Sequence, residues 1–174
     1  DNGELLQSFE GHTDGVMATQ WSTDGQQILT GSLDGTARIW NVDNGVELNQ
    51  LTGHTDGVIT VQWSAGDEKI LTGSWDNRAK VWDATNGDLL HELEGHTDGV
   101  LVVRMSEDQR HILTASRDGT ARIWDAKNGE LLRQLTGHTR PLTQVWWDET
   151  EGTILTSSYD GTARLWDNQN GQEL

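Results

Sequence analysis

Histidine and aspartate recur along this chain at one fixed spacing, and both are residue types used for acid–base catalysis and metal binding. Four histidines each follow a glycine and precede, by 22 residues, an aspartate in a tight-turn sequence. An active site is rarely built four times identically, so the repetition favours a structural role for these residues. The pairs are His12 with Asp34, His54 with Asp76, His96 with Asp118, and His138 with Asp160.

The remaining chemistry-bearing residues form no recognisable catalytic set. His91 and His111 fall at repeat positions where other copies carry Asn, Arg, Gln or Lys, which predicts surface placement rather than metal binding. The chain has no cysteine, no metal-ligand cluster and no phosphate-binding loop motif. Its aspartates and glutamates are distributed according to the repeat, and they do not form the carboxylate pair of a hydrolase site. We therefore predict that the protein is not an enzyme and needs no metal or cofactor.

Charge and hydropathy restrict the partners. The chain of 174 residues has 28 acidic and 12 basic side chains, for a net charge of -16. That charge would repel nucleic acid and anionic membrane surfaces. No apolar run approaches the roughly 18 residues of a membrane span, and the first residues do not resemble a signal peptide. We expect a cytoplasmic location, with no nucleic-acid or membrane partner.

The positions of these residues follow from an internal repeat. Gly-His pairs and Trp-Asp or Trp-Asn pairs both step by 42 residues without insertion or deletion, which divides the single domain 1–174 into repeats of approximately 11–52, 53–94, 95–136 and 137–174. Each repeat holds four short β-prone runs separated by Gly, Asn and Asp turn residues. The sequence therefore predicts an all-β chain with four strands per repeat.

The combination of Gly-His, about 28 further residues and Trp-Asp, at this period, resembles the WD40 repeat family. The resemblance covers essentially the whole chain. It implies a β-propeller whose blades are four-stranded antiparallel sheets around a central channel. It also implies, in each blade, a buried polar network of the Gly-His histidine, a strand hydroxyl, the turn aspartate and the Trp-Asp tryptophan.

The four implied networks are complete in this chain. Their members are His12, Thr30, Asp34 and Trp40; His54, Thr72, Asp76 and Trp82; His96, Thr114, Asp118 and Trp124; and His138, Thr156, Asp160 and Trp166. From the sequence alone, Ser32, Ser74, Ser116 and Ser158 remain alternatives for the hydroxyl members. Each group is costly to bury alone, but together they can satisfy one another.

The two ends of the repeat pattern predict assembly. Residues 3–9 match the fourth-strand residues 45–51, while the fourth repeat stops just after its third strand. We expect the N-terminal strand 3–9 to complete a blade begun by a C-terminus. WD40 rings resemble the larger propellers, and an open arc would expose two apolar faces. We therefore predict that the chain is half of an eight-bladed ring, closed head-to-tail in a homodimer.

Function is expected where the repeats differ on one face. The residue before each turn aspartate varies and resembles the top-face contact position of the family; together with Arg140 these positions, here called the rim, are Leu33, Trp75, Arg117, Tyr159 and Arg140. Trp, Tyr and Arg are enriched at interaction hot spots. We predict a non-catalytic scaffold that presents the rim to a protein or peptide. Two alternatives remain: a sensory or regulatory segment of a larger bacterial signalling protein, and an engineered or fragment-derived self-assembling propeller without a ligand.

Overall fold

The computed structural model describes residues 3–148 and 150–174, which form four antiparallel sheets, one per repeat. Blade 1 contains β1 (Val16–Trp21), β2 (Gln27–Ser32), β3 (Thr36–Asn41) and β4 (Glu47–Thr52). Blade 2 contains β5 (Val58–Trp63), the short 3-10 turn η1 (Ala65–Asp67), β6 (Lys69–Ser74), β7 (Ala79–Asp83) and β8 (Leu89–Leu93). Blade 3 contains β9 (Val100–Met105), β10 (His111–Ser116), β11 (Ala121–Asp125) and β12 (Leu131–Leu135). Blade 4 contains β13 (Leu142–Asp148), β14 (Thr153–Ser158) and β15 (Ala163–Asp167).

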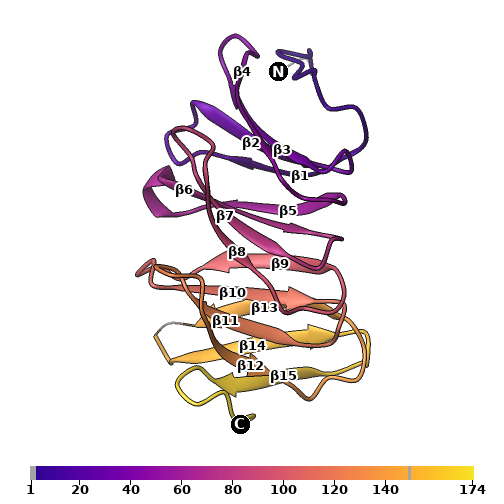
Figure 1. The fold of residues 1–174 in the computed structure, drawn as a ribbon, viewed down its shortest axis with the longest axis vertical. Coiled ribbons are helices and arrows are strands. Elements are labelled where there is room, and N and C mark those ends of the chain that lie inside the picture. Colours follow the sequence, from indigo (N-terminus) through magenta and orange to yellow (C-terminus); the bar gives the residue numbers. More distant parts are fainter. Residues whose placement is uncertain (1–2, 149) are drawn as a thin grey trace.

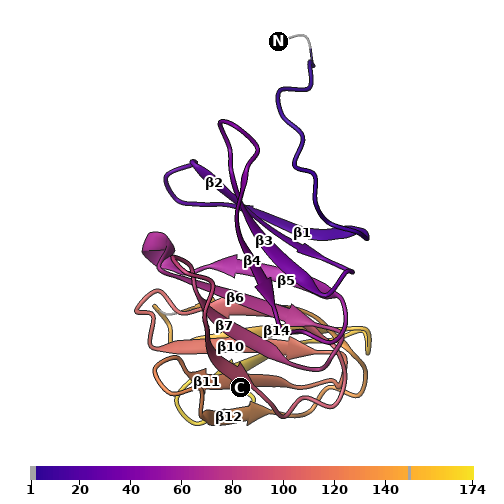
Figure 2. The same cartoon turned by 45° about the horizontal axis from the view of Figure 1, so that its top comes forward.

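The four blades are stacked face to face in chain order. Figure 1 shows the first blade at one end of the stack and β15 at the other, with the two termini at opposite ends. Residues 3–9 form no strand within the chain: Phe9 lies against Trp40 of blade 1, and Figure 2 shows the N-terminal end of the segment extending beyond that blade. The predicted all-β fold of repeated antiparallel blades is confirmed, while pairing of residues 3–9 with another copy stays a prediction.

The hairpin between the second and third strands of each blade depends on a residue that tolerates positive φ. Gly35, Gly119 and Gly161 have φ values of 81°, 82° and 86°, and Asn77 reaches 71° in blade 2. Most residues that have a β-carbon disfavour positive φ, and Asn is among the few that adopt it. The Asp-Gly and Asp-Asn pairs in the sequence are therefore selected by turn geometry.

A hydrophobic core fills each junction between neighbouring blades. At the first junction Leu29, Ile39 and Leu51 of blade 1 pack with Val58 and Trp82 of blade 2, and all five are essentially buried. The corresponding residues form the cores of the second and third junctions. The middle strands are covered on both faces, as in β7, where four of five residues are buried. Stacking is therefore what buries each blade.

The innermost strands are joined differently at successive junctions. The side-chain oxygen of Gln20 accepts a hydrogen bond from the Trp63 amide at 2.8 Å, and Gln62 accepts one from the Met105 amide at 2.8 Å. At the third junction Arg104 replaces the glutamine, and its guanidinium lies 5.4 Å from the ring centroid of Trp146. Arg104 and Trp146, the two residues that replace glutamine at this repeat position, thus contact each other.

Among the described residues there is no helix able to span a membrane.

Candidate functional site

The histidine of each Gly-His pair lies at the centre of a hydrogen-bonded relay, seen most clearly in blade 3. Trp124 Nε1–H donates to Thr114 Oγ1 at 2.9 Å, and Thr114 Oγ1 lies 2.7 Å from His96 Nε2. His96 Nδ1 lies 2.8 Å from Asp118 Oδ2. A carboxylate only accepts, so Nδ1 donates to it, while Nε2 accepts from the threonine hydroxyl. With the proton on Nδ1, every member of the relay has a hydrogen-bond partner.

The same relay occurs in the other three blades. The histidine-to-aspartate distances are 2.8, 2.7 and 2.8 Å in blades 1, 2 and 4. The hydroxyl partners of the histidines are Thr30, Thr72 and Thr156. The tryptophan donors are Trp40, Trp82 and Trp166. The structure thus distinguishes the two hydroxyls left open by the sequence, because the serines bond elsewhere.

Ser116 illustrates the second hydroxyl. Its Oγ donates to the carbonyl of Asp98 at 2.7 Å and accepts from the amide of Asp118 at 3.0 Å. Ser32, Ser74 and Ser158 also accept from the following turn aspartate. The threonine therefore faces the imidazole, while the serine ties the hairpin turn to the loop before the first strand.

The turn aspartates are strongly stabilised as carboxylates. Burial alone would raise the pKa of Asp118, but hydrogen bonds from His96 and Thr120 outweigh burial and hold that pKa well below its usual range. The balance at Asp34 and Asp76 is the same, and at Asp160 the hydroxyl of Thr162 is the largest cause of a depressed pKa. Each carboxylate therefore remains charged and firmly bonded at neutral pH.

These relays have little capacity for external chemistry. The four histidine side chains are only 1–5% exposed, and both ring nitrogens of each are engaged. Within residues 3–148 and 150–174, no group of three or more His, Cys, Asp or Glu could hold a metal. The geometry fits a structural role, in which each relay connects the loop before a blade to the second and third strands of that blade.

The rim is only partly a free surface. Leu33 packs over Gly57 of the next blade, where a Cβ would lie 2.8 Å from Leu33 Cδ2, and Trp75 covers Gly99 so closely that a Cβ would overlap its indole. The guanidinium of Arg117 lies 5.2 Å from the ring centroid of Trp75. Adjacent rim side chains therefore join neighbouring blades as well as facing solvent.

The rest of the rim is more open. Tyr159 is 64% exposed, and Arg140 Nη1 donates to the Tyr159 carbonyl at 3.3 Å. The structure thus brings Trp75 and Arg117 into one stack and Arg140 and Tyr159 into another pair. Gly57 and Gly99, which precede the first strand of the next blade, are the sequence signal from which this packing could have been predicted.

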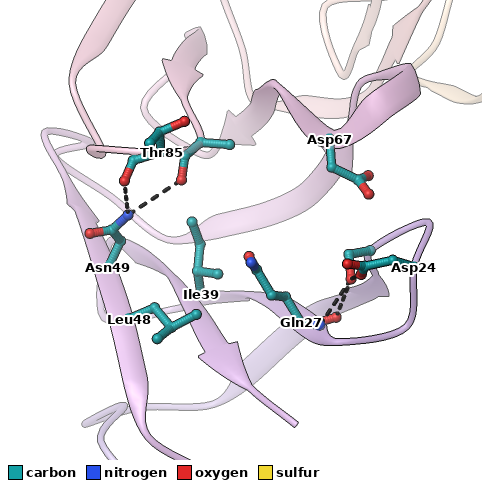
Figure 3. A pocket seen from close by; sticks show the side chains of 9 residues that line it. Asp24, Gln27, Ile39, Leu48, Asn49, Asp67 and Thr85 are labelled. Atoms are coloured by element: carbon teal, nitrogen blue, oxygen red, sulfur yellow. Dashed lines mark hydrogen bonds between the residues drawn. The ribbon is translucent and has the colours of Figure 1, made fainter.

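A polar groove at the opposite end of the strands was also missed. Figure 3 shows it between blades 1 and 2, where Asn49 Nδ2 donates to the carbonyls of Ala84 and Thr85 at 3.3 and 3.2 Å. The cavity measures about 430 Å³ and is lined on its far side by Asp24 and Asp67. Asp67 accepts from the Thr23 amide at 2.7 Å, so these contacts also fasten one blade to the next.

Comparison with known proteins agrees with this architecture. The sequence profile of the family described as "WD domain, G-beta repeat" matches residues 3–41, 45–83, 87–125 and 129–167. The chain is 44% identical over 41 residues to Protein groucho of Drosophila melanogaster, a match covering 24% of this chain and 6% of that protein. The chain thus spans only a small part of this curated relative.

Solved structures match over nearly the whole chain. The computationally designed Ika4 protein superposes with a TM-score of 0.84 at 29% identity, covering 95% of this chain and 98% of Ika4. The computationally designed Ika8 protein gives a TM-score of 0.83 at 29% identity, with 92% of this chain but only 48% of Ika8 covered. The repeats, relays and stacked blades, together with the family profile matched in all four repeats, establish that the chain belongs to the WD40 repeat family.

Proposed function

We propose that this chain is a non-catalytic WD40 scaffold that pairs with a second copy to close an eight-bladed propeller and offers its rim to a protein or peptide. The observation that carries the assembly is the exposure of core positions at the two ends of the stack. Leu29, Leu71 and Leu113 are all 0% exposed at the internal junctions, but their counterpart Leu155 in blade 4 is 43% exposed.

At the opposite end of the stack, core positions of blade 1 are also exposed. Trp63 is 5% exposed beneath blade 1, but its counterpart Trp21 in blade 1 is 58% exposed. Val58 is 0% exposed, while its counterpart Val16 is 48% exposed. The free face of blade 4 is thus equivalent to the face that blades 1–3 pack against the following blade. The free face of blade 1 is equivalent to the face that blade 2 packs against the preceding blade. Head-to-tail pairing of two copies would bury both free faces of each copy in two identical interfaces. Each large apolar side chain that becomes buried would contribute about 1.5–3 kcal/mol.

The solution mass tests this proposal. The chain has a mass of 19.3 kDa, so the closed ring should have twice that mass in multi-angle light scattering. The dimer should persist on dilution, because two identical interfaces form at once and strengthen each other. A mass of one chain at micromolar concentration would contradict the proposed assembly.

The rim supports a second part of the proposal, the presentation of a binding surface. The Trp75–Arg117 stack and the exposed Tyr159 place aromatic and cationic groups on one face of a rigid scaffold. The overall charge of -16 favours a neutral or basic partner, whereas Arg117 and Arg140 provide local positive charge. We therefore expect a partner that is neutral or basic overall, with apolar side chains that contact the aromatic groups and a few acidic groups that meet the two arginines.

Peptide display against the assembled protein tests the rim. Peptides selected on the unaltered chain should lose at least about tenfold in affinity when Arg117 and Tyr159 are both replaced by alanine. These exposed side chains contribute little to the cores, so the melting temperature should remain nearly unchanged. Trp75 is a poor first target because it packs on Gly99. Selected peptides that bind the double variant equally well would remove the rim from the proposal.

A self-assembling propeller without a ligand is the second candidate function. The match to the designed Ika4 protein over 95% of this chain supports it. Display selections that yield no rim-dependent peptide from a confirmed dimer would favour this alternative. Membership of a larger signalling protein and a cytoplasmic location stay predictions.

A further inference from the structure

We propose that a groove between blades 2 and 3, at the end of the strands opposite the rim, binds an acidic peptide segment. The groove, here called the cationic groove, has a volume of about 540 Å³. Lys69, where β6 begins, lies on one side of it, whereas the rim residue Trp75 follows the other end of β6. The rest of the lining comes from blade 3: Gln109, Arg110, His111, Asp125, Ala126 and Lys127.

The cationic side chains of this groove have few partners within the chain. The chain has only 12 basic side chains against 28 acidic ones, yet three basic side chains meet here. Lys69 and Lys127 form no ion pair with any described residue, and Arg110, whose side chain is 80% exposed, has its Nε 3.9 Å from Asp108 Oδ2. Like charges gathered in one groove repel one another, and a bound carboxylate would relieve that repulsion.

The carboxylates nearest to these cations are engaged in turns. Asp125 Oδ1 accepts from the amides of Lys127 and Asn128 at 2.8 and 3.2 Å. Asp108 Oδ1 accepts from the Ser106 hydroxyl at 2.7 Å and from the Arg110 amide at 2.9 Å. Backbone donors therefore balance much of the negative charge beside the groove, and the long cationic side chains remain available to an external carboxylate.

The equivalent groove between blades 1 and 2 has the opposite charge. Figure 3 shows its carboxylates, Asp24 and Asp67. Both grooves are tied across their junction at the same repeat position, where Asp67 accepts from the Thr23 amide and Gln109 Nε2 donates to the Ala65 carbonyl at 2.9 Å. From the first groove to the second, the changes are Asp24 to Gly66, Gln27 to Lys69, Asp67 to Gln109 and Thr85 to Lys127. Each change makes the second groove more positive, so the fold itself does not require this charge.

The extent of the positive surface favours an extended peptide over a compact anion. His111 lines the cationic groove and also an adjoining pocket that contains Arg133. Positive charge therefore continues past His111 toward the junction of blades 3 and 4. An arginine fork binds a carboxylate through two hydrogen bonds and a lysine through one point charge, so several carboxylates along one peptide could be bound together.

A short peptide also fits the overall charge better than nucleic acid does. The net charge of -16 repels a long polyanion, whose phosphates carry charge at every step. A peptide with a few glutamates or aspartates experiences mainly the groove, because more distant charges are screened by salt within roughly 10 Å. Both walls of the groove belong to one chain, so the expected binding does not require the dimer or the rim.

Fluorescence anisotropy with a short labelled peptide of alternating glutamate and serine tests this proposal. The groove variant takes each new side chain from the same position of another repeat: Lys69→Gln, Arg110→Gln and Lys127→Thr follow Gln27, Gln26 and Thr85. We expect its dissociation constant for the peptide to be at least about tenfold higher than that of the unaltered chain, because charge-assisted hydrogen bonds are lost. A peptide with glutamine in place of glutamate should not bind the unaltered chain.

A control variant changes the net charge equally but away from the cationic groove. It places glutamates on or just after the outer strands, at positions where blade 2 has Glu92 or Glu94: Thr52→Glu, Gln134→Glu and Thr136→Glu. It should bind the peptide within about twofold of the unaltered chain, and circular dichroism should show both variants folded. Equal weakening in the two variants, undiminished binding by the groove variant, or no binding by the unaltered chain would overturn the proposal. Tighter binding of a single-stranded oligonucleotide than of the peptide would overturn the choice of a peptide.

Discussion

Replacing Leu165 with aspartate is expected to hold the chain as a monomer at concentrations where the unaltered chain is a dimer. Leu165 is 41% exposed on the free face of blade 4, while its counterparts Ile39, Val81 and Ile123 are at most 1% exposed at the internal junctions. Closure would bury the new carboxylate in an apolar core without a partner. We expect the dimer dissociation constant to rise at least about 100-fold, measured by analytical ultracentrifugation.

Leu132 provides a matched control for this change. It is also 41% exposed, but it lies on the outer strand β12, away from either end of the stack. Leu132→Asp should dimerise like the unaltered chain, and far-ultraviolet circular dichroism should show both variants folded. Equal dissociation constants for the two aspartate variants would mean that the end face of blade 4 does not form the interface.

Asp118→Ala should lower the free energy of unfolding by about 3 kcal/mol, because it leaves four donors, three of them in partly buried hydrogen bonds, without this acceptor. The carboxylate accepts from His96 Nδ1, from the amides of Thr97 and Thr120, and from the Thr120 hydroxyl. The loss should appear in urea unfolding followed by tryptophan fluorescence. Alanine at the exposed Asp43 is the control and should change the free energy of unfolding by less than about 0.5 kcal/mol.

The sign of the pH dependence gives a second check on Asp118. Its pKa is depressed in the folded state, so its contribution to stability is complete above the ordinary aspartate pKa of about 4 and declines as the pH falls below that value. The difference between the unaltered chain and Asp118→Ala should therefore shrink on acidification. A difference that grows below pH 4 would contradict the assigned role of the carboxylate.

The repeat made much of the fold predictable. The fixed spacing of Gly-His and Trp-Asp located four hairpin blades, and the Asp-Gly and Asp-Asn pairs located turns that need positive φ. The choice between Thr114 and Ser116 as partner of His96 could not be predicted, because both lie on one strand face two residues apart. The position of the loop that carries His96 is needed to choose between them: its imidazole meets Thr114, and Ser116 instead donates to the carbonyl of Asp98.

The rim and the end segments show where pattern reasoning stops. Leu33 and Trp75 belong to the predicted rim because the residue at their repeat position varies, but variation does not reveal that each packs on a glycine of the next blade. Residues 3–9 carry the pattern of an outer strand, yet a strand forms only where a neighbouring strand pairs with it, and residues 3–9 pair with no strand among the described residues. The missing information in both cases is which surfaces meet.

The inner-strand contacts restrict how this gene could recombine. Duplicating the second repeat would place a copy of Gln62 against the amide of Trp63, as Gln20 is now, so the added module should be tolerated. Duplicating the third repeat alone would place one Arg104 opposite a copy of itself, without the indole of Trp146 beneath it. The third and fourth modules should therefore be inherited as a unit, whereas the first two can be exchanged.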